Sequence, residues 1–301
     1  MQSSSRSWLV IGVAVLLGAG LAWAGSTGSA ALGPLSLFAM AVAAAYLLQW
    51  LAFVPSWLAK TERFYDLTGG ISYLAITVFL LLANPGRGAA AWIVGAMVVL
   101  WSARLALFLF TRVLRSGGDG RFDEIKQQPV RLLQTWTLQG LWITATAGTA
   151  WAVLSDPSGR GIDAWLVIGA LIWVVGLGVE AAADAQKRAF AARKENRGRF
   201  ITTGLWASSR HPNYLGEIVL WIGVAVAAVP SLHGAAWVLL VSPLFVTLLI
   251  TKVSGVPLLE KRAEARWGGD PAYRAYVQST PILLPWVGRK GPWAASKEAT
   301  A

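Results

Sequence analysis

The chain has 301 residues, of which 55% are hydrophobic and only 14% are charged. Soluble domains average about 25% charged residues, so this composition excludes an ordinary soluble protein. The chain contains no cysteine, which excludes disulfide and thiolate chemistry, and with only two histidines it is not expected to bind a metal such as zinc.

Long uncharged stretches recur along the chain. Each is long enough to cross a bilayer core, which needs about 20 apolar residues. Turn residues divide the longer stretches. We therefore predict an all-α transmembrane bundle of about seven or eight spans. The eight predicted spans are 8–24, 34–58, 67–83, 90–111, 132–153, 164–183, 213–229 and 235–253.

Lysine and arginine are unevenly distributed between the two sides that these spans define. If both termini are cytoplasmic, Arg87 and Arg160 are the basic residues on the opposite side, and Arg104 lies inside a span. This is the positive-inside pattern, which predicts cytoplasmic termini. It also explains the net charge of +11 without a nucleic-acid partner, because the basic residues flank membrane spans.

The first 24 residues have two interpretations. Arg6, an apolar stretch and the sequence AWA at 22–24 resemble a cleaved signal peptide, but the apolar stretch is also long enough to span. No loop is long enough for a soluble domain. We predict a single membrane domain over 1–288 and a disordered polar tail over 289–301.

Polar side chains also lie at membrane depth in the N-terminal half of the chain. Gln49 falls in the second span, and Glu62, Tyr65 and Asp66 lie at the start of the third. Arg104 lies in the middle of the fourth span and needs a carboxylate or a ligand as its partner. Intramembrane ionisable residues indicate function by default, although interhelical hydrogen bonds are the alternative.

The stretch NRGRFITTGLWASSRHPNYLGE, residues 196–217, concentrates polar side chains at one membrane boundary. Pro212 fits the first turn of the next span, whose free amides favour anions. Paired arginine donors can hold a phosphate or a carboxylate there. The alternative is a positive-inside flank with incidental polar residues.

The candidate cofactor-binding residues come from this stretch and from the end of the preceding span. They are Glu180, Asp184, Arg197, Arg199, Arg210, His211, Asn213, Tyr214 and Glu217. Glu180 and Asp184 share a helical face with Arg188, so an intrahelical salt ladder is the alternative for that pair. Further on, Glu260 and Glu264 lie one turn apart on a short amphipathic helix, which is also typical of a membrane-surface helix with ion pairs.

From about residue 181 to 285 the chain resembles the steroid 5α-reductase superfamily. The resemblance rests on the sequences ADAQKRAF, GLWASSRHPNYLGE and LLEKRAEARWGGDPAYRAY. The stretch QWLAFVPSWLAKTERFYDLTGGISYL is similar to an uncharacterised, largely bacterial branch with a steroid-reductase-like C-terminal region. The superfamily also includes the membrane isoprenylcysteine and phospholipid methyltransferases. The resemblance implies a helix bundle in the bacterial inner membrane, with NADPH bound between the C-terminal helices in a cavity open to the cytoplasm.

Carried over position by position, the resemblance assigns cofactor contacts to Asp184, Asn213 and Glu217. Arg210, His211 and Tyr214 match its boundary motif, and Glu180 stands where the reductases often have Asn. On the substrate side, Gln49 matches a glutamine of the reductases, but Trp50 replaces its glutamate partner. Trp101, three residues before Arg104, replaces a tyrosine, so the acid that usually polarises an enone is missing from its place.

We therefore expect an NADPH-dependent membrane reductase of a lipophilic substrate, acting on an activated C=C bond. Gln49, Trp101 and Arg104 are the candidate substrate residues, and Tyr65, Asp66 or Glu62 is the candidate acid that stabilises the enolate. The first alternative is a methyltransferase of a lipid or prenyl substrate that uses S-adenosylmethionine. The second is a non-enzymatic transporter or lipid-binding protein. Membrane lipid is the expected surrounding in each case.

Overall fold

The computed structural model describes residues 2–116 and 122–285, and the predicted tail at 289–301 lies outside these residues. Apart from a hairpin of two-residue strands, the regular structure is helical, which confirms the all-α prediction. Within the described ranges, seven stretches are long and apolar enough to cross a membrane, so the chain is an integral membrane protein. They are Ser4–Gly25, Leu37–Leu58, Tyr65–Ala83, Ala89–Ala106, Ala164–Ala192, Pro212–Ser231 and Gly234–Trp267.

Most helices follow the predicted spans to within a few residues. The helix at span 8–24 begins six residues earlier than predicted, and the helices at spans 90–111 and 164–183 end five and nine residues later. The span predicted at 235–253 consists of a 3-10 segment, a short α-helix and a π-helical turn. The α-helices are α1 (Gln2–Gly25), α2 (Leu37–Leu58), α3 (Tyr65–Ala83), α4 (Ala89–Ser116), α5 (Pro129–Ser155), α6 (Ala164–Ala192), α7 (Pro212–Ala228), α8 (Val241–Leu248), α9 (Val256–Trp267) and α10 (Pro271–Ser279). Strands β1 (Ala31–Leu32) and β2 (Leu35–Ser36) pair antiparallel between α1 and α2.

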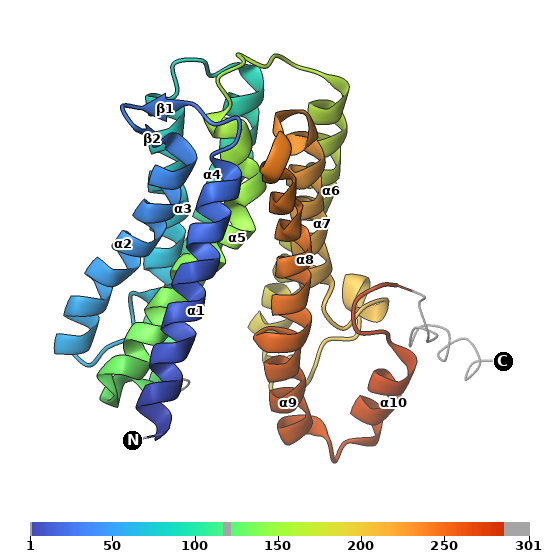
Figure 1. Cartoon of the computed structure of the whole chain (residues 1–301). Coiled ribbons are helices and arrows are strands. Elements are labelled where there is room, and N and C mark those ends of the chain that lie inside the picture. The colour runs from blue at the N-terminus through green and yellow to red at the C-terminus, as the bar shows by residue number, and fades with distance from the viewer. Residues whose placement is uncertain (1, 117–121, 286–301) are drawn as a thin grey trace. The chain divides into compact units, whose positions relative to one another are not determined.

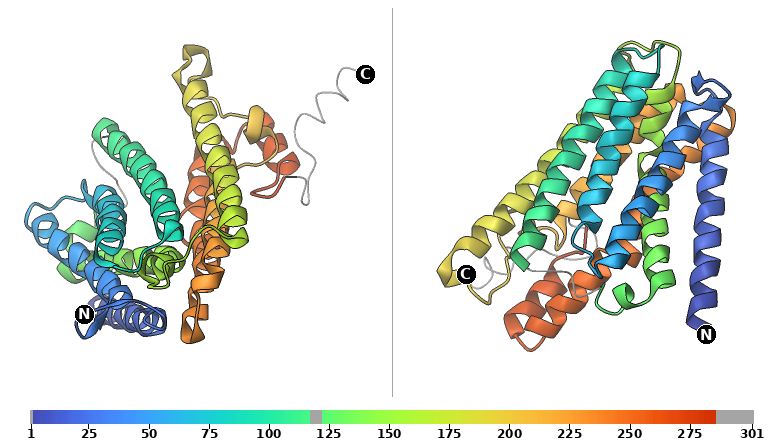
Figure 2. Two further views of the ribbon diagram at one scale, coloured as in Figure 1. Left: turned by 90° about the horizontal axis from the view of Figure 1, so that it is seen from above. Right: turned by 90° about the vertical axis from the view of Figure 1, so that its left-hand side faces the viewer.

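The chain divides into two compact units, where the sequence predicts a single membrane domain. Unit 1 comprises the chain up to Ala170 together with Val224–Ser242, and unit 2 comprises Leu171–Gly223 and the chain from Pro243 onward. The divisions fall inside α6, α7 and α8, so each of these helices contributes to both units. Figures 1 and 2 show these helices along their length.

Helix α5 is the centre of unit 1. It packs against α1, α2, α3 and α4, which run beside it in Figure 1. Its residues from Ile143 to Ser155 are all buried, and Trp136 and Trp151 are among the largest fully buried side chains. Because protein rather than lipid covers this helix, it accommodates threonine and glutamine. This explains why the span predicted at 132–153 is a helix but is not among the seven apolar stretches.

Within unit 2, α6 and α7 touch backbone to backbone. A Cβ atom added at Gly216 would lie 2.5 Å from the Glu180 amide nitrogen and 2.6 Å from the Gly176 carbonyl oxygen. A Cβ atom added at Gly176 would likewise meet the backbone of Leu220 and Gly216. Small residues permit this close approach of membrane helices. The contact fixes the end of α6 against the beginning of α7.

The C-terminal segment of unit 2 returns to the beginning of α7. Helix α8 continues as a π-helical turn, Leu249–Val253. The helical structure is then interrupted at Gly255, after which α9 begins. Figure 2 shows α9 and α10, in red, beyond the end of α8. After α10 the chain lies beside the boundary motif, where the Arg210 amide donates to the Pro281 carbonyl (2.9 Å) and the His211 amide to the Ile282 carbonyl (3.1 Å).

We expect Gly216→Ala to lower the stability of the protein by about 1–3 kcal/mol, because its methyl group overpacks the contact between α6 and α7. The measurement is the midpoint of thermal unfolding in detergent micelles, followed by circular dichroism. Gly178→Ala is the matched control, since a Cβ atom at Gly178 meets nothing within 4 Å. Equal midpoints for the two variants would contradict the close contact.

Candidate ligand pocket in unit 2

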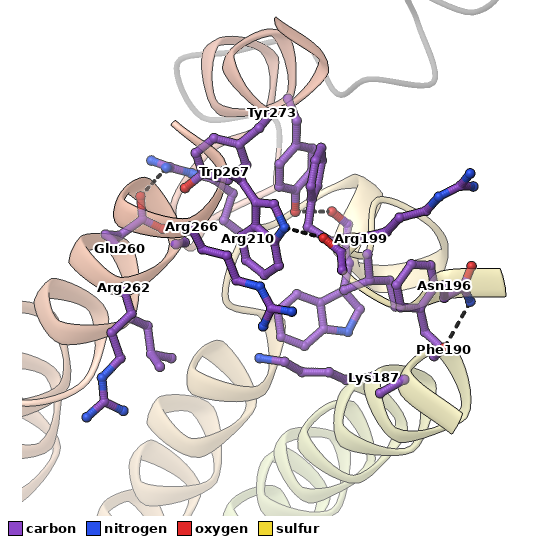
Figure 3. A pocket seen from close by; sticks show the side chains of 18 of the residues that line it. Lys187, Phe190, Asn196, Arg199, Arg210, Glu260, Arg262, Arg266, Trp267 and Tyr273 are labelled. Carbon is purple, nitrogen blue, oxygen red and sulfur yellow. Dashed lines mark hydrogen bonds and ion pairs between the residues drawn. The ribbon is translucent and has the colours of Figure 1, made fainter. Parts of the chain in front are cut away.

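Unit 2 contains a pocket of about 600 Å³, a volume typical of small-molecule and cofactor sites (Figure 3). Four elements form its walls: the end of α6, the loop between α6 and α7, helix α9 and helix α10. The lining residues are Lys187, Phe190, Ala191, Asn196, Arg197, Gly198, Arg199, Phe200, Ile201, Trp206, Arg210, His211, Leu259, Glu260, Arg262, Ala263, Arg266, Trp267, Tyr273 and Tyr276.

The charges of the lining are strongly unbalanced. Six of the described lining residues are basic, and Glu260 is the one carboxylate among the described lining residues. Figure 3 shows Lys187 reaching in from α6 and Arg266 from α9, so the positive charge comes from opposite walls. A pocket with this excess of cationic donors favours an anionic ligand. The basic lining residues are Lys187, Arg197, Arg199, Arg210, Arg262 and Arg266.

Glu260 of α9 binds two consecutive residues of the boundary motif. Its Oε2 pairs with Nη1 of Arg210, and its Oε1 lies 2.7 Å from Nε2 of His211. The Arg210 and His211 side chains are each 6% exposed. Burial lowers the pKa of His211 below its ordinary value of 6.5, although hydrogen bonding to Glu260 acts in the opposite direction. His211 is therefore neutral at pH 7.

Aromatic rings form another wall of the pocket. Phe200 contacts the rings of Trp267, Tyr273 and Tyr276 at centroid distances of 5.7, 5.2 and 5.8 Å. The Tyr276 hydroxyl donates to the Trp206 carbonyl (2.7 Å), and burial raises the pKa of this tyrosine. The Trp206 indole in turn donates to the backbone of α6. These contacts hold the loop between α6 and α7 against α10 and α6.

Four of the predicted cofactor residues line this pocket, and five do not. Arg197, Arg199, Arg210 and His211 belong to the lining. Outside the lining are Glu180 and Asp184 on α6, which are buried, and Asn213, Tyr214 and Glu217 on the first two turns of α7.

The beginning of α7 supports the pocket wall from outside the lining. Tyr214 stacks on the His211 ring, with the centroids 5.7 Å apart and the planes at 20°. Oδ1 of Asn213 is buried and has no hydrogen-bond partner among the residues that the structure describes. This polar atom is therefore available to a ligand only if the covering side chains move.

The predicted substrate and acid residues all belong to unit 1. Gln49 is fully buried and donates to the Ser72 hydroxyl (2.8 Å), while the Trp101 ring packs edge-on against Tyr73 at 5.2 Å. Arg104 lies on α4 and Asp66 in the first turn of α3, and both are partly buried.

All three candidate acids have protein partners. Glu62 forms an ion pair with Lys126 (3.3 Å), and hydrogen bonds to Asp123 and Glu62 raise the pKa of this lysine. The Tyr65 hydroxyl donates to the Thr135 carbonyl (3.2 Å). Either side chain would have to leave its partner in order to donate a proton to a substrate.

Sequence reasoning missed the contribution of α9. Leu259, Arg262, Ala263 and Arg266 all line the pocket, and they recur at i, i+3, i+4 and i+7, so they share one helical face. The sequence interpretation named no pocket residue on this helix and left a membrane-surface helix with ion pairs open as the alternative. The spacing of Arg262 and Arg266 along α9 was the signal in the sequence that could have revealed this pocket face. Glu260 lies beside the same face.

Fold and lining together define a polytopic helical membrane protein with a basic, aromatic-walled pocket. The chain belongs to the DUF1295 family, which is described as a protein of unknown function and whose model matches residues 52–280. All the lining residues fall inside this matched region. Comparisons with curated proteins and with solved structures found no match.

The protein should lose stability as the pH falls from about 7.5 to 5. The unfolded chain takes up a proton on His211 near pH 6.5, whereas the folded chain takes it up only at lower pH. The unfolded state thus binds more protons in this window, and the slope for one group is at most about 1.4 kcal/mol per pH unit.

The measurement is the thermal midpoint as a function of pH for the wild type, His211→Gln and His233→Gln. We expect the slope below pH 6.5 to be reduced in His211→Gln and retained in His233→Gln. Above that pH the three proteins should show little difference in slope. Identical slopes throughout would show that His211 does not carry the effect.

Proposed function

We propose that the pocket of unit 2 binds NADPH and that the protein is a membrane reductase of a lipophilic substrate. The observation that carries this proposal is the convergence of six basic side chains on one pocket that contains a single carboxylate among its described lining residues. Arginine side chains bind phosphate oxygens through two parallel hydrogen bonds, and phosphates are the principal anionic groups of this coenzyme.

The state of Glu260 strengthens the preference for an anion. Both of its oxygens are engaged, one by Arg210 and one by His211. A cationic ligand would therefore meet five basic side chains besides Arg210, with no unengaged carboxylate among the described lining residues. S-adenosylmethionine carries a positive sulfonium and no phosphate, so the methyltransferase alternative is less compatible with this lining.

The shape and chemistry of the remaining walls suit the rest of a dinucleotide. Phe200, Trp206 and Trp267 supply flat apolar surface for the adenine or nicotinamide ring, while Asn196 offers amide donors and acceptors. When bound, the coenzyme supplies a hydride. The resemblance of residues 181–285 to the steroid 5α-reductases is a second, independent support for this choice.

The hydride of the bound coenzyme would be suited to the β-carbon of a conjugated carbonyl, and the protein's own part would be to provide for proton addition at the α-carbon. An acid from Glu62, Tyr65 or Asp66 would stabilise the enolate that develops. Gln49, Trp101 and Arg104 are the proposed substrate contacts. We further propose a bacterial inner-membrane location with cytoplasmic termini, because the basic loops require the positive side to face the cytosol.

We expect NADPH to raise the thermal midpoint of the purified protein in detergent, and S-adenosylmethionine not to do so. Arg266→Ala and Arg199→Ala should each weaken NADPH binding about tenfold, because each removes one charge-assisted contact. Tryptophan fluorescence quenching gives the dissociation constants. Lys261→Ala on the same helix and Arg193→Ala beside the same loop are the matched controls, since both residues are exposed and lie outside the lining.

Each outcome of this ligand test favours one function. Stabilisation by S-adenosylmethionine alone would replace the reductase by the methyltransferase. The absence of any nucleotide effect, combined with binding or flux of a lipid, would favour the transporter or lipid-binding alternative. If the lining variants and their controls bind NADPH with equal affinity, this pocket is not the coenzyme site.

A further inference from the structure

Glu260 connects two elements that are far apart in the sequence. It lies on α9, and its side chain binds Arg210 (Figure 3). It also binds His211, and these two residues directly precede α7. The backbone amides of the same two residues also donate to the carbonyls of Pro281 and Ile282. The position of both side chains in the pocket wall is therefore set by contacts with the C-terminal segment.

This arrangement determines which nitrogen of His211 carries the proton. A carboxylate only accepts hydrogen bonds, and Arg210 already donates to its other oxygen. The neutral imidazole must therefore donate to Glu260 through Nε2–H, so Nδ1 carries a lone pair. Nδ1 is buried and has no hydrogen-bond partner within the described part of the chain.

We propose that Glu260 is a positioning residue of the pocket, which holds His211 as its Nε2–H tautomer so that Nδ1 accepts a hydrogen bond from a hydroxyl or amide N–H of the ligand. The ligand part of this proposal rests on the proposed function, whereas the tautomer does not. A buried acceptor without a donor carries a desolvation penalty, and a ligand that supplies the donor removes it. Protein atoms cover Nδ1, so the ring or its cover must shift slightly as the ligand binds.

The charged groups around His211 come from three elements. Glu260 on α9 favours the protonated form, while Lys187 on α6 and Arg210 on its own segment oppose it. Tyr214 stacks on the ring. Burial is the largest influence and keeps the imidazole neutral. Loss of the Glu260 charge should therefore make His211 still harder to protonate, because only the two cations remain.

Nitrogen NMR of histidine-labelled protein tests the tautomer directly, because the chain has only two histidines. His233→Gln leaves His211 as the single signal. In that background we expect the Nε2–H tautomer at pH 7.5. In Glu260→Gln we expect a mixture of the two tautomers, and a protonation midpoint lower by about one pH unit. A dominant Nδ1–H tautomer in the protein with Glu260 intact would overturn the proposal.

Glu264→Gln is the control for Glu260→Gln. It lies one turn further along α9, is exposed and does not line the pocket, so the His211 signal should not change. If Glu260→Gln fails to fold, the tautomer in the presence of Glu260 still decides the first half of the proposal. Glu260→Asp is then measured in place of Glu260→Gln. A retained Nε2–H signal together with a shifted protonation midpoint of His211 supports the positioning role.

Coenzyme affinity tests the second half. We expect Glu260→Gln and His211→Phe to weaken NADPH binding about tenfold, and Glu264→Gln to leave it unchanged. If NADPH does not bind the wild type at all, the proposed function fails while the tautomer result stands. If NADPH binds and Glu260→Gln alters neither the tautomer nor the affinity, the positioning role is wrong and the proposed function survives.

Discussion

The contact between Glu260 and the pair Arg210–His211 is the interaction on which the pocket depends. It joins α9 to the segment that begins α7, and the hydrogen bonds to Pro281 and Ile282 add the chain that follows α10. Without it, a buried guanidinium and a buried imidazole would lose their shared acceptor, which is costly away from water. The walls of the pocket therefore stabilise one another, because α9 supplies the carboxylate and the segment before α7 supplies the hydrogen-bond donors.

The charge balance of the pocket follows from this contact. Because one carboxylate is occupied by two partners, the other basic lining residues have no acidic partner among the described lining residues. Cationic side chains that exceed the carboxylates around them attract anions from solution over roughly a Debye length. The same feature that stabilises the wall thus leaves the interior positive, which is the property that the proposed coenzyme requires.

The helices could be predicted from the sequence because span length and hydropathy are local properties. Arg197, Arg199, Arg210 and His211 could be predicted for the same reason, since one short motif carries them. Arg262 and Arg266 could not, because their role depends on α9 lying opposite that motif. Helix α7 meets α6 through Gly216, and Asn213 and Glu217 lie outside the lining, a consequence of helix orientation that sequence spacing does not determine.

The backbone contact between Gly176 and Gly216 limits how unit 2 can deform. Two helices that meet without intervening side chains have no compressible layer between them, so sliding or rolling at that point meets immediate repulsion. The chain before α9 turns at Gly255, where a Cβ atom would lie 2.8 Å from the Ile250 carbonyl oxygen and 3.0 Å from the Tyr214 ring, so a larger residue at this turn would push α9 away from the beginning of α7.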